Sequence, residues 1–155
     1  MITDHEITLA TLEDAQAIAE LSRDAIEYGL PWRWTPQRVS VAIRDRSTNV
    51  LVARRAAAAL HGFAVMQYGD ETAHLSLLAV RESARRHGVA SALLEWLEAS
   101  ARVAGIQTLR LEVRASNLGA MAFYARMGFV ESGIRTGYYE GLEDAFRMSK
   151  RLATG

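Results

Sequence analysis

The stretch AVRESARRHGVASALL, residues 79–94, decides how the rest of the chain is interpreted. An apolar run ends there, Arg85, Arg86 and His87 follow, and a helical pattern begins at Gly88. The first N–H groups of a helix lack partners within it, the helix dipole adds positive charge, and glycine lets a ligand approach the backbone. Together these features predict a phosphate or diphosphate site. The alternative, that the arginines are solvated charges of a surface loop, stays open at this point.

The composition limits the kind of protein this sequence can form. The chain has 155 residues, of which 50% are hydrophobic and 23% charged, which predicts one globular domain over residues 1–155. Eighteen basic residues balance eighteen acidic ones, which argues against nucleic acid as a partner. There is no cysteine, so disulfides, thiolate metal sites and a cysteine nucleophile are excluded. Neither G-x-G-x-x-G nor G-x-x-x-x-G-K-[ST] occurs, which argues against a Rossmann dinucleotide site and a P-loop.

No apolar run is long enough to cross a bilayer, and the N-terminal stretch has acidic residues where a secretory signal would be apolar. We therefore expect a cytoplasmic protein with no membrane partner and no metal, as a monomer or a homodimer. Hydrophobic periodicity and turn residues predict the following elements. They are strand 7–10, helices beginning at 11 and 35, strands 49–54, 61–68 and 73–80, helix 88–103, strand 108–113, helix 117–126, strand 128–135, loop 136–142 and strand 143–152. The connection 55–60 has no turn chemistry. This order predicts an α/β fold, a mixed sheet with helices on both faces.

Several motifs resemble the GNAT N-acetyltransferase superfamily. RRHGVA (85–90) is similar to its Q/R-x-x-G-x-G/A signature, with Ala90 in place of the commoner second glycine, and LLAV and ALL flank it as they do in the family. LEVRASNLGAMAFYARMGF (111–129) resembles the family's next strand and helix. YYEGLEDAFRM (138–148) resembles the end of the branch that acetylates protein N-termini, typified by ribosomal-protein-alanine N-acetyltransferase.

The resemblance implies a single-domain GNAT fold, a twisted and mostly antiparallel sheet of about six to seven strands. It implies acetyl-CoA as co-substrate and transfer of the acetyl group to a primary amine, with a protein N-terminus as one acceptor. A small-molecule amine (a polyamine, an antibiotic or an amino-acid-like compound) and a non-catalytic acyl-CoA-sensing domain are the alternatives. In the family, the strand end and the basic turn hold the co-substrate. The corresponding residues are Leu78, Ala79, Val80, Arg85, Arg86, His87, Gly88, Val89, Ala90, Ser91 and Asn117.

Two side chains are candidates for moving protons. On strand 108–113, Glu112 shares its face with Arg110 and Arg114, so it either faces a polar cleft or pairs with those arginines. The resemblance aligns Glu112 with the general base, and His74, which shares a strand face with Ser76, is the alternative base. Tyr124 is the candidate acid that protonates the leaving thiolate, and its spacing from Asn117 matches the family. A tyrosine packed in the core is the alternative role.

Four aromatic residues are the candidates for binding the acceptor. Trp32 and Trp34 lie between the first two predicted helices, and Tyr138 and Tyr139 lie between the last two predicted strands. In the family these two loops border the acceptor, and exposed aromatic residues are typical of a binding surface. The same four residues could instead be core or dimer contacts. Because the chain has no cysteine, an acyl-cysteine route is excluded, and we expect direct attack of the amine within a ternary complex.

Overall fold

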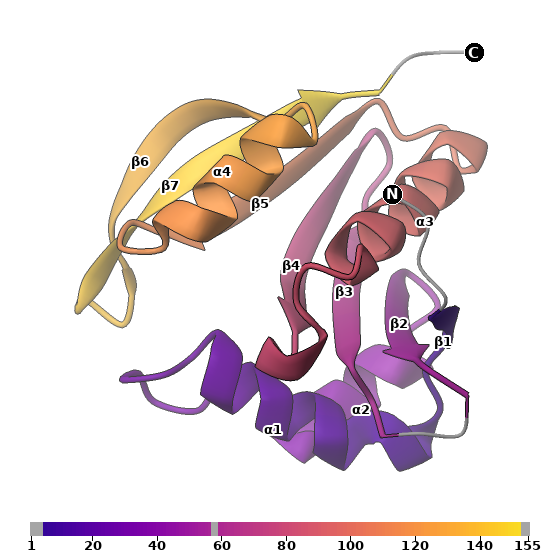
Figure 1. Ribbon diagram of the computed structural model, residues 1–155. Coiled ribbons are helices and arrows are strands. Elements are labelled where there is room, and N and C mark those ends of the chain that lie inside the picture. The colour runs from indigo at the N-terminus through magenta and orange to yellow at the C-terminus, as the bar shows by residue number, and fades with distance from the viewer. Residues whose placement is uncertain (1–4, 57–58, 153–155) are drawn as a thin grey trace.

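The computed structural model describes residues 5–56 and 59–152 (Figure 1). The strands are β1 (Glu6–Leu9), β2 (Thr48–Arg54), β3 (Gly62–Tyr68), β4 (Thr72–Val80), β5 (Thr108–Arg114), β6 (Val130–Tyr139) and β7 (Glu143–Arg151). The helices are α1 (Ala15–Ala25), α2 (Pro36–Arg44), α3 (Val89–Val103) and α4 (Leu118–Arg126), with short 3-10 turns η1 (Leu12–Asp14) and η2 (Glu82–Ala84). The predicted α/β fold is confirmed.

The sheet has seven strands in the order β1-β2-β3-β4-β5-β7-β6. Every neighbouring pair is antiparallel except β4 and β5, which run parallel. These two strands pair only where 72–74 meet 108–110, and beyond that point they diverge, as Figure 1 shows. Because the diverging ends lose their ladder hydrogen bonds to each other, the middle of the sheet opens into a wedge. The candidate site lies in that wedge.

Two apolar layers cover the two faces of the sheet. One core packs α3 and α4 against side chains such as Leu51, Met66 and Leu109, and the other packs α1 and α2 against Val52, Phe63 and others. Alternate residues of β2 and β3 serve opposite cores, which is what the two-residue period of a strand requires. The predicted placement of helices on both faces is confirmed.

A β-bulge interrupts β4 at the edge of the wedge. Val65 pairs with Leu77 and Met66 with Leu75, so Ser76 is the extra residue between two paired positions. A bulge reverses which face the following residues occupy. Accordingly Leu75 belongs to the core under α3, whereas Leu77 belongs to the core under α1.

Most predicted helix ends are confirmed. The Thr35 hydroxyl accepts a hydrogen bond from Arg38 N at 3.3 Å, and Asn117 Oδ1 accepts one from Ala120 N at 3.0 Å, so both residues cap their helices. The first helix begins at Ala15 rather than at residue 11, because 12–14 form the 3-10 turn η1.

The predicted loop 136–142 is wrong in part, since β6 continues to Tyr139. The strand passes through a register shift between Arg135 and Tyr139, and Gly137 adopts a φ of +63° within it. That glycine indicates a loop in the sequence, but here it accommodates an irregularity inside a strand. The preceding boundary also moves, because β6 begins at Val130 rather than at 128.

The connection 55–60 is only partly described, because residues 57 and 58 lie outside the described residues. Ala56 takes a φ of +55°, a left-handed conformation without the glycine that usually permits it. Leu60 is buried, and its carbonyl accepts a hydrogen bond from the Arg81 side chain. None of the helices in 5–56 and 59–152 is long and apolar enough to cross a membrane.

Candidate active site

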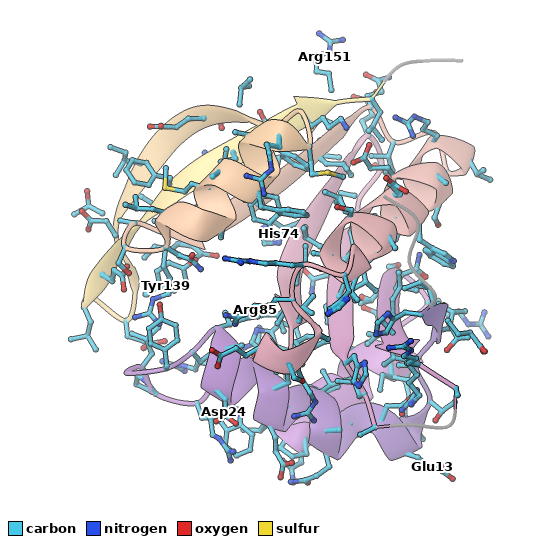
Figure 2. The ribbon with its side chains drawn as sticks, viewed as in Figure 1. Glu13, Asp24, His74, Arg85, Tyr139 and Arg151 are labelled. Carbon is cyan, nitrogen blue, oxygen red and sulfur yellow. The ribbon has the colours of Figure 1, made fainter. Side chains whose placement is uncertain are left out.

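A cavity of about 710 Å³ occupies the wedge between β4 and β5. Its lining comes from the end of α1 and the loop after it, most of β4, the end of β5, the start of α4 and the β6–β7 turn. In Figure 2, His74, Arg85 and Tyr139 lie around the opening between the α1 side and the α4 side of the molecule. The cavity is thus reached by groups from segments far apart in the sequence.

The two candidate bases are bonded to each other in this cavity. His74 Nε2 lies 3.0 Å from Glu112 Oε1 and 3.2 Å from Glu112 Oε2. The pairing follows from the parallel register, in which His74 is opposite Arg110 and Glu112 lies two residues further along the same face. Glu112 is largely buried, with 9% of its side chain exposed, and His74 is half-buried.

The surroundings of Glu112 keep its carboxylate charged. Burial by itself raises the pKa of Glu112, but the hydrogen bond and the charge of His74 lower it, followed by a hydrogen bond from Tyr138 and the charge of Arg147. The net result is a pKa below the usual value for glutamate. Glu112 is therefore ionised near neutral pH and can accept a proton.

Tyr124 faces the same cavity from α4 and is buried to 8% exposure. Its ring packs edge-on against Phe123 and Phe129, with centroid distances of 5.2 Å and 5.6 Å. Burial raises the pKa of the Tyr124 hydroxyl. The phenol therefore stays protonated, as a general acid must before it donates.

The basic turn divides between the cavity and the solvent. Arg85, Arg86 and His87 are all exposed, but of the three it is Arg85 that lines the cavity, and its Nε donates to Val80 O at 3.3 Å. Gly88 precedes α3 with a φ of +76°, which glycine adopts without strain. The first amide groups of a helix have no partners within it, so the start of α3 is the position that the predicted anion site would occupy.

The remaining predicted co-substrate residues fall into two groups. Leu78, Ala79, Val80, Ala90 and Asn117 line the cavity. Val89 instead points into the core with 2% exposure, and Ser91 is partly buried outside the cavity lining. The side chains of these two residues therefore do not line the cavity, and what they can contribute is the backbone of the first turn of α3. Val89 Cγ1 lies 3.1 Å from the position that a Cβ on Gly62 would take, which shows how tightly α3 packs on β3.

The four predicted acceptor residues are not equivalent. Trp34, Tyr138 and Tyr139 line the cavity, and the two tyrosine rings stack edge-on at 5.0 Å. Trp34 is buried under the Arg38 guanidinium, 3.9 Å from its ring centroid. Trp32 lies outside the cavity lining, because its Nε1 donates to Ala19 O at 3.1 Å and holds the ring against α1.

Sequence reasoning did not select Glu27, which organises the loop between α1 and α2. Its buried carboxylate accepts hydrogen bonds from Ser22 Oγ at 2.8 Å and from the backbone N–H groups of Arg33 and Trp34 at 2.7 Å and 3.2 Å. Nothing in its local sequence distinguishes it from a surface glutamate after a helix. Glu27 also lines the cavity, so it fixes one wall of the acceptor side.

Arg114 joins the two loops that border the acceptor side. Its guanidinium donates to Ile26 O and Tyr28 O at 3.0 Å and 2.7 Å, and pairs with Glu143 at 2.7 Å. Strand alternation placed Arg114 on the face of Glu112, but its partners lie too far along the sequence for the pattern to reveal them.

Known proteins that are similar to this chain are acetyltransferases. The acetyltransferase (GNAT) family matches residues 10–129. A [ribosomal protein bS18]-alanine N-acetyltransferase of Escherichia coli K12 is 43% identical over 90 residues, which are 56% of this chain and 61% of that protein. An N-alpha-acetyltransferase of Saccharolobus solfataricus is 26% identical over 157 residues, 96% of this chain and 94% of that protein. The crystal structure of Ard1 from Thermoplasma volcanium superimposes with a TM-score of 0.85 and 27% identity over 97% of this chain and 99% of that one.

The chain belongs to the acetyltransferase (GNAT) family. The matched segment spans about 61% of the length of the ribosomal-protein-alanine N-acetyltransferase, whereas the similarity to the archaeal N-alpha-acetyltransferase covers nearly all of both chains.

Proposed function

We propose that this enzyme transfers the acetyl group of acetyl-CoA to the α-amine of a protein N-terminus by direct attack within a ternary complex. The observation that carries the proposal is the wedge itself. One side offers the open amides of α3 and the end of β4, which suit a diphosphate and an extended pantetheine arm. The other side offers Glu112, Tyr138 and Tyr139 to an acceptor.

The chemistry assigns one task to each proton-moving residue. Glu112, ionised at neutral pH, takes the proton that the amine releases as its nitrogen bonds to the acetyl carbon. Tyr124, protonated and facing the cavity, donates to the sulfur as the C–S bond breaks. Glu112 on β5 and Tyr124 on α4 line the same cavity, which supports separate roles for them in one reaction.

The weak basicity of Glu112 favours an N-terminal amine over a lysine side chain. An α-amino group has a pKa of about 8, against about 10.4 for lysine, so far more of it is neutral at physiological pH. A carboxylate with a lowered pKa is a weak base, so it accepts the proton of the amine only after the nitrogen has begun to attack the acetyl carbon. Glu112 is such a carboxylate.

The test is a panel of acceptors assayed for thiol release from acetyl-CoA and for product mass. It includes short peptides that differ in their first residue, the same peptides with a blocked N-terminus and an internal lysine, and small amines such as polyamines. We expect acetylation of free peptide N-termini. Acetylation of small amines alone would identify a small-molecule enzyme, and binding of acetyl-CoA without transfer to any amine would identify a sensor domain.

A further inference from the structure

The bonded pair of His74 and Glu112 has a third member, Ser76. Ser76 Oγ lies 3.3 Å from His74 Nδ1, while His74 Nε2 lies 3.0 Å from Glu112 Oε1. All three residues line the cavity. A hydroxyl bonded to an imidazole that is itself bonded to a carboxylate is the arrangement that activates a serine nucleophile.

The hydrogen bonds determine which nitrogen of His74 can act as a base. The ionised Glu112 carboxylate can only accept a hydrogen bond, so His74 Nε2 carries the proton that is donated to it. In neutral His74, Nδ1 is therefore the unprotonated nitrogen, and it can accept a hydrogen bond from the Ser76 hydroxyl. This is the protonation state that a general base needs, and a serine–histidine distance slightly above 3.2 Å is common before a ligand is bound.

The fold also brings Ser76 near the expected position of the thioester, a step that rests on the proposed function. β4 runs toward the basic turn, so a pantetheine arm leaving a diphosphate at α3 runs back along the strand from Val80 to Leu78. The acetyl end is therefore expected beside residues 75–77, and Ser76 carries the one hydroxyl among these three. The bulge at Ser76 lies on the half-buried edge of the wedge, facing His74.

The geometry points to a second reaction of this enzyme, acceptor-independent hydrolysis of acetyl-CoA through an acetyl ester on Ser76. Ser76 Oγ attacks the thioester carbon and its proton passes to His74 Nδ1. The C–S bond breaks and that proton goes to the sulfur, which leaves as the coenzyme A thiol. Water then attacks the ester, giving one proton to His74, and the ester C–O bond breaks as His74 returns the proton to Ser76. The products are acetic acid and coenzyme A, and no other reactant is consumed.

Ser76 has no task in transfer to an amine, because Glu112 accepts the proton of the amine directly. The two reactions therefore depend on Ser76 differently. An amine in the acceptor site competes for the acetyl group, so hydrolysis is expected when the acceptor is absent. Glu112 and His74 belong to both reactions, and only substitution of Ser76 separates them.

The experiment measures thiol release from acetyl-CoA without any amine, using the full chain and four variants. Ser76→Ala and His74→Gln are expected to reduce acceptor-free release at least about tenfold. Ser76→Thr keeps the hydroxyl and retains part of it. Ser132→Ala, a serine on exposed β6 outside the cavity lining, leaves it unchanged. Thermal unfolding of each variant shows that the fold persists.

Mass spectrometry of the acid-quenched protein supplies a second readout. An acetyl group on the peptide containing Ser76, removed by alkaline hydroxylamine, identifies an ester. The background is small, because Lys150 is the one lysine of the chain, is partly buried and is paired with Glu98.

The same preparations are then given a peptide acceptor. We expect Ser76→Ala to retain acetyl transfer to the amine. Acceptor-free thiol release that is absent, or equal in the wild type and in Ser76→Ala, would overturn the hydrolysis inference while leaving the proposed function intact. Failure of the wild type to acetylate any amine would instead remove the proposed function.

Discussion

At the scale of single residues, the proposed acetyl transfer depends on Glu112 being a charged acceptor of protons. Replacement of Glu112 by glutamine keeps the shape of the side chain and removes its basicity. We expect kcat to fall about a hundredfold or more, with the dissociation constant of acetyl-CoA nearly unchanged. Steady-state kinetics and calorimetry measure the two quantities. Equal losses of rate and of co-substrate affinity would show that Glu112 supports binding and not proton transfer.

His74 is one of the groups that lower the pKa of Glu112, so we expect it to affect the pH dependence of the proposed transfer. Because His74 lowers the pKa of Glu112, its removal raises that pKa, and the acid limb of the kcat profile should move to higher pH. His74→Leu removes both the hydrogen bond and the charge, whereas His74→Gln keeps a donor and should shift the limb less. The profiles are compared with one acceptor at saturation. An acid limb at the same pH in His74→Leu and in the wild type would contradict this effect of His74.

The sequence indicated these residues but not their relations. Glu112 and His74 were alternative bases in the sequence, and only the register of β4 against β5 shows them bonded. Ser76 was a neighbour on a strand face, and the bulge that places it in the cavity depends on the pairing with β3. Both facts are non-local, so no pattern within one segment contains them.

At the scale of elements, the proposed diphosphate site is the first turn of α3. Arg86 is exposed beside it, and a nearby positive charge adds to the helix dipole. We expect Arg86→Ala to weaken acetyl-CoA binding about two- to five-fold with kcat unchanged, and the loss to shrink at high salt. Calorimetry at two salt concentrations measures it, with the exposed Arg126→Ala on α4 as the matched control. Equal effects of the two substitutions would mean that the turn binds no phosphate.

Local chemistry predicted these elements well where a side chain acts on its own backbone. Thr35 and Asn117 cap the helices that they were expected to cap. The predicted loop at 136–142 is partly strand, because β7 pairs with this segment on both sides of a register shift. Gly137 lies within that shift, and in the sequence it indicates a loop. The divergence of β4 from β5, which creates the cavity, follows from the packing of the whole sheet and has no signature in either strand.

At the scale of the whole molecule, the two sides of the wedge are held together behind the site. Lys150 on β7 donates to Glu98 on α3 and to Met127 O after α4, each at 2.8 Å. Glu98 is 5% exposed, and its Oε2 has no partner among the described residues. Buried carboxylates of this kind are stable only when paired.

Lys150→Met should therefore destabilise the protein by about 3 kcal/mol, because Glu98 is left with Arg102 alone. The double variant Glu98→Leu/Lys150→Met replaces the pair by apolar groups and should recover most of that loss. Chemical denaturation measures both. A double variant no more stable than Lys150→Met would show that the ion pair is not what the fold requires here.

The overall architecture was predictable because one motif and its flanking segments resemble a family whose members share this fold, and the comparison confirms it. The volume and shape of the cavity could not be predicted from the sequence. They depend on where segments far apart in the sequence meet, including the loop that Glu27 and Arg114 hold in place.

The central claim is that acetyl-CoA lies in the wedge with its acetyl group between Glu112 and Tyr124. A crystal structure with a conjugate of coenzyme A and a peptide N-terminus tests it most directly. We expect the diphosphate at the amides opening α3 and the former amine nitrogen within hydrogen-bond reach of Glu112. A conjugate bound elsewhere, or with its nitrogen remote from Glu112, would contradict it.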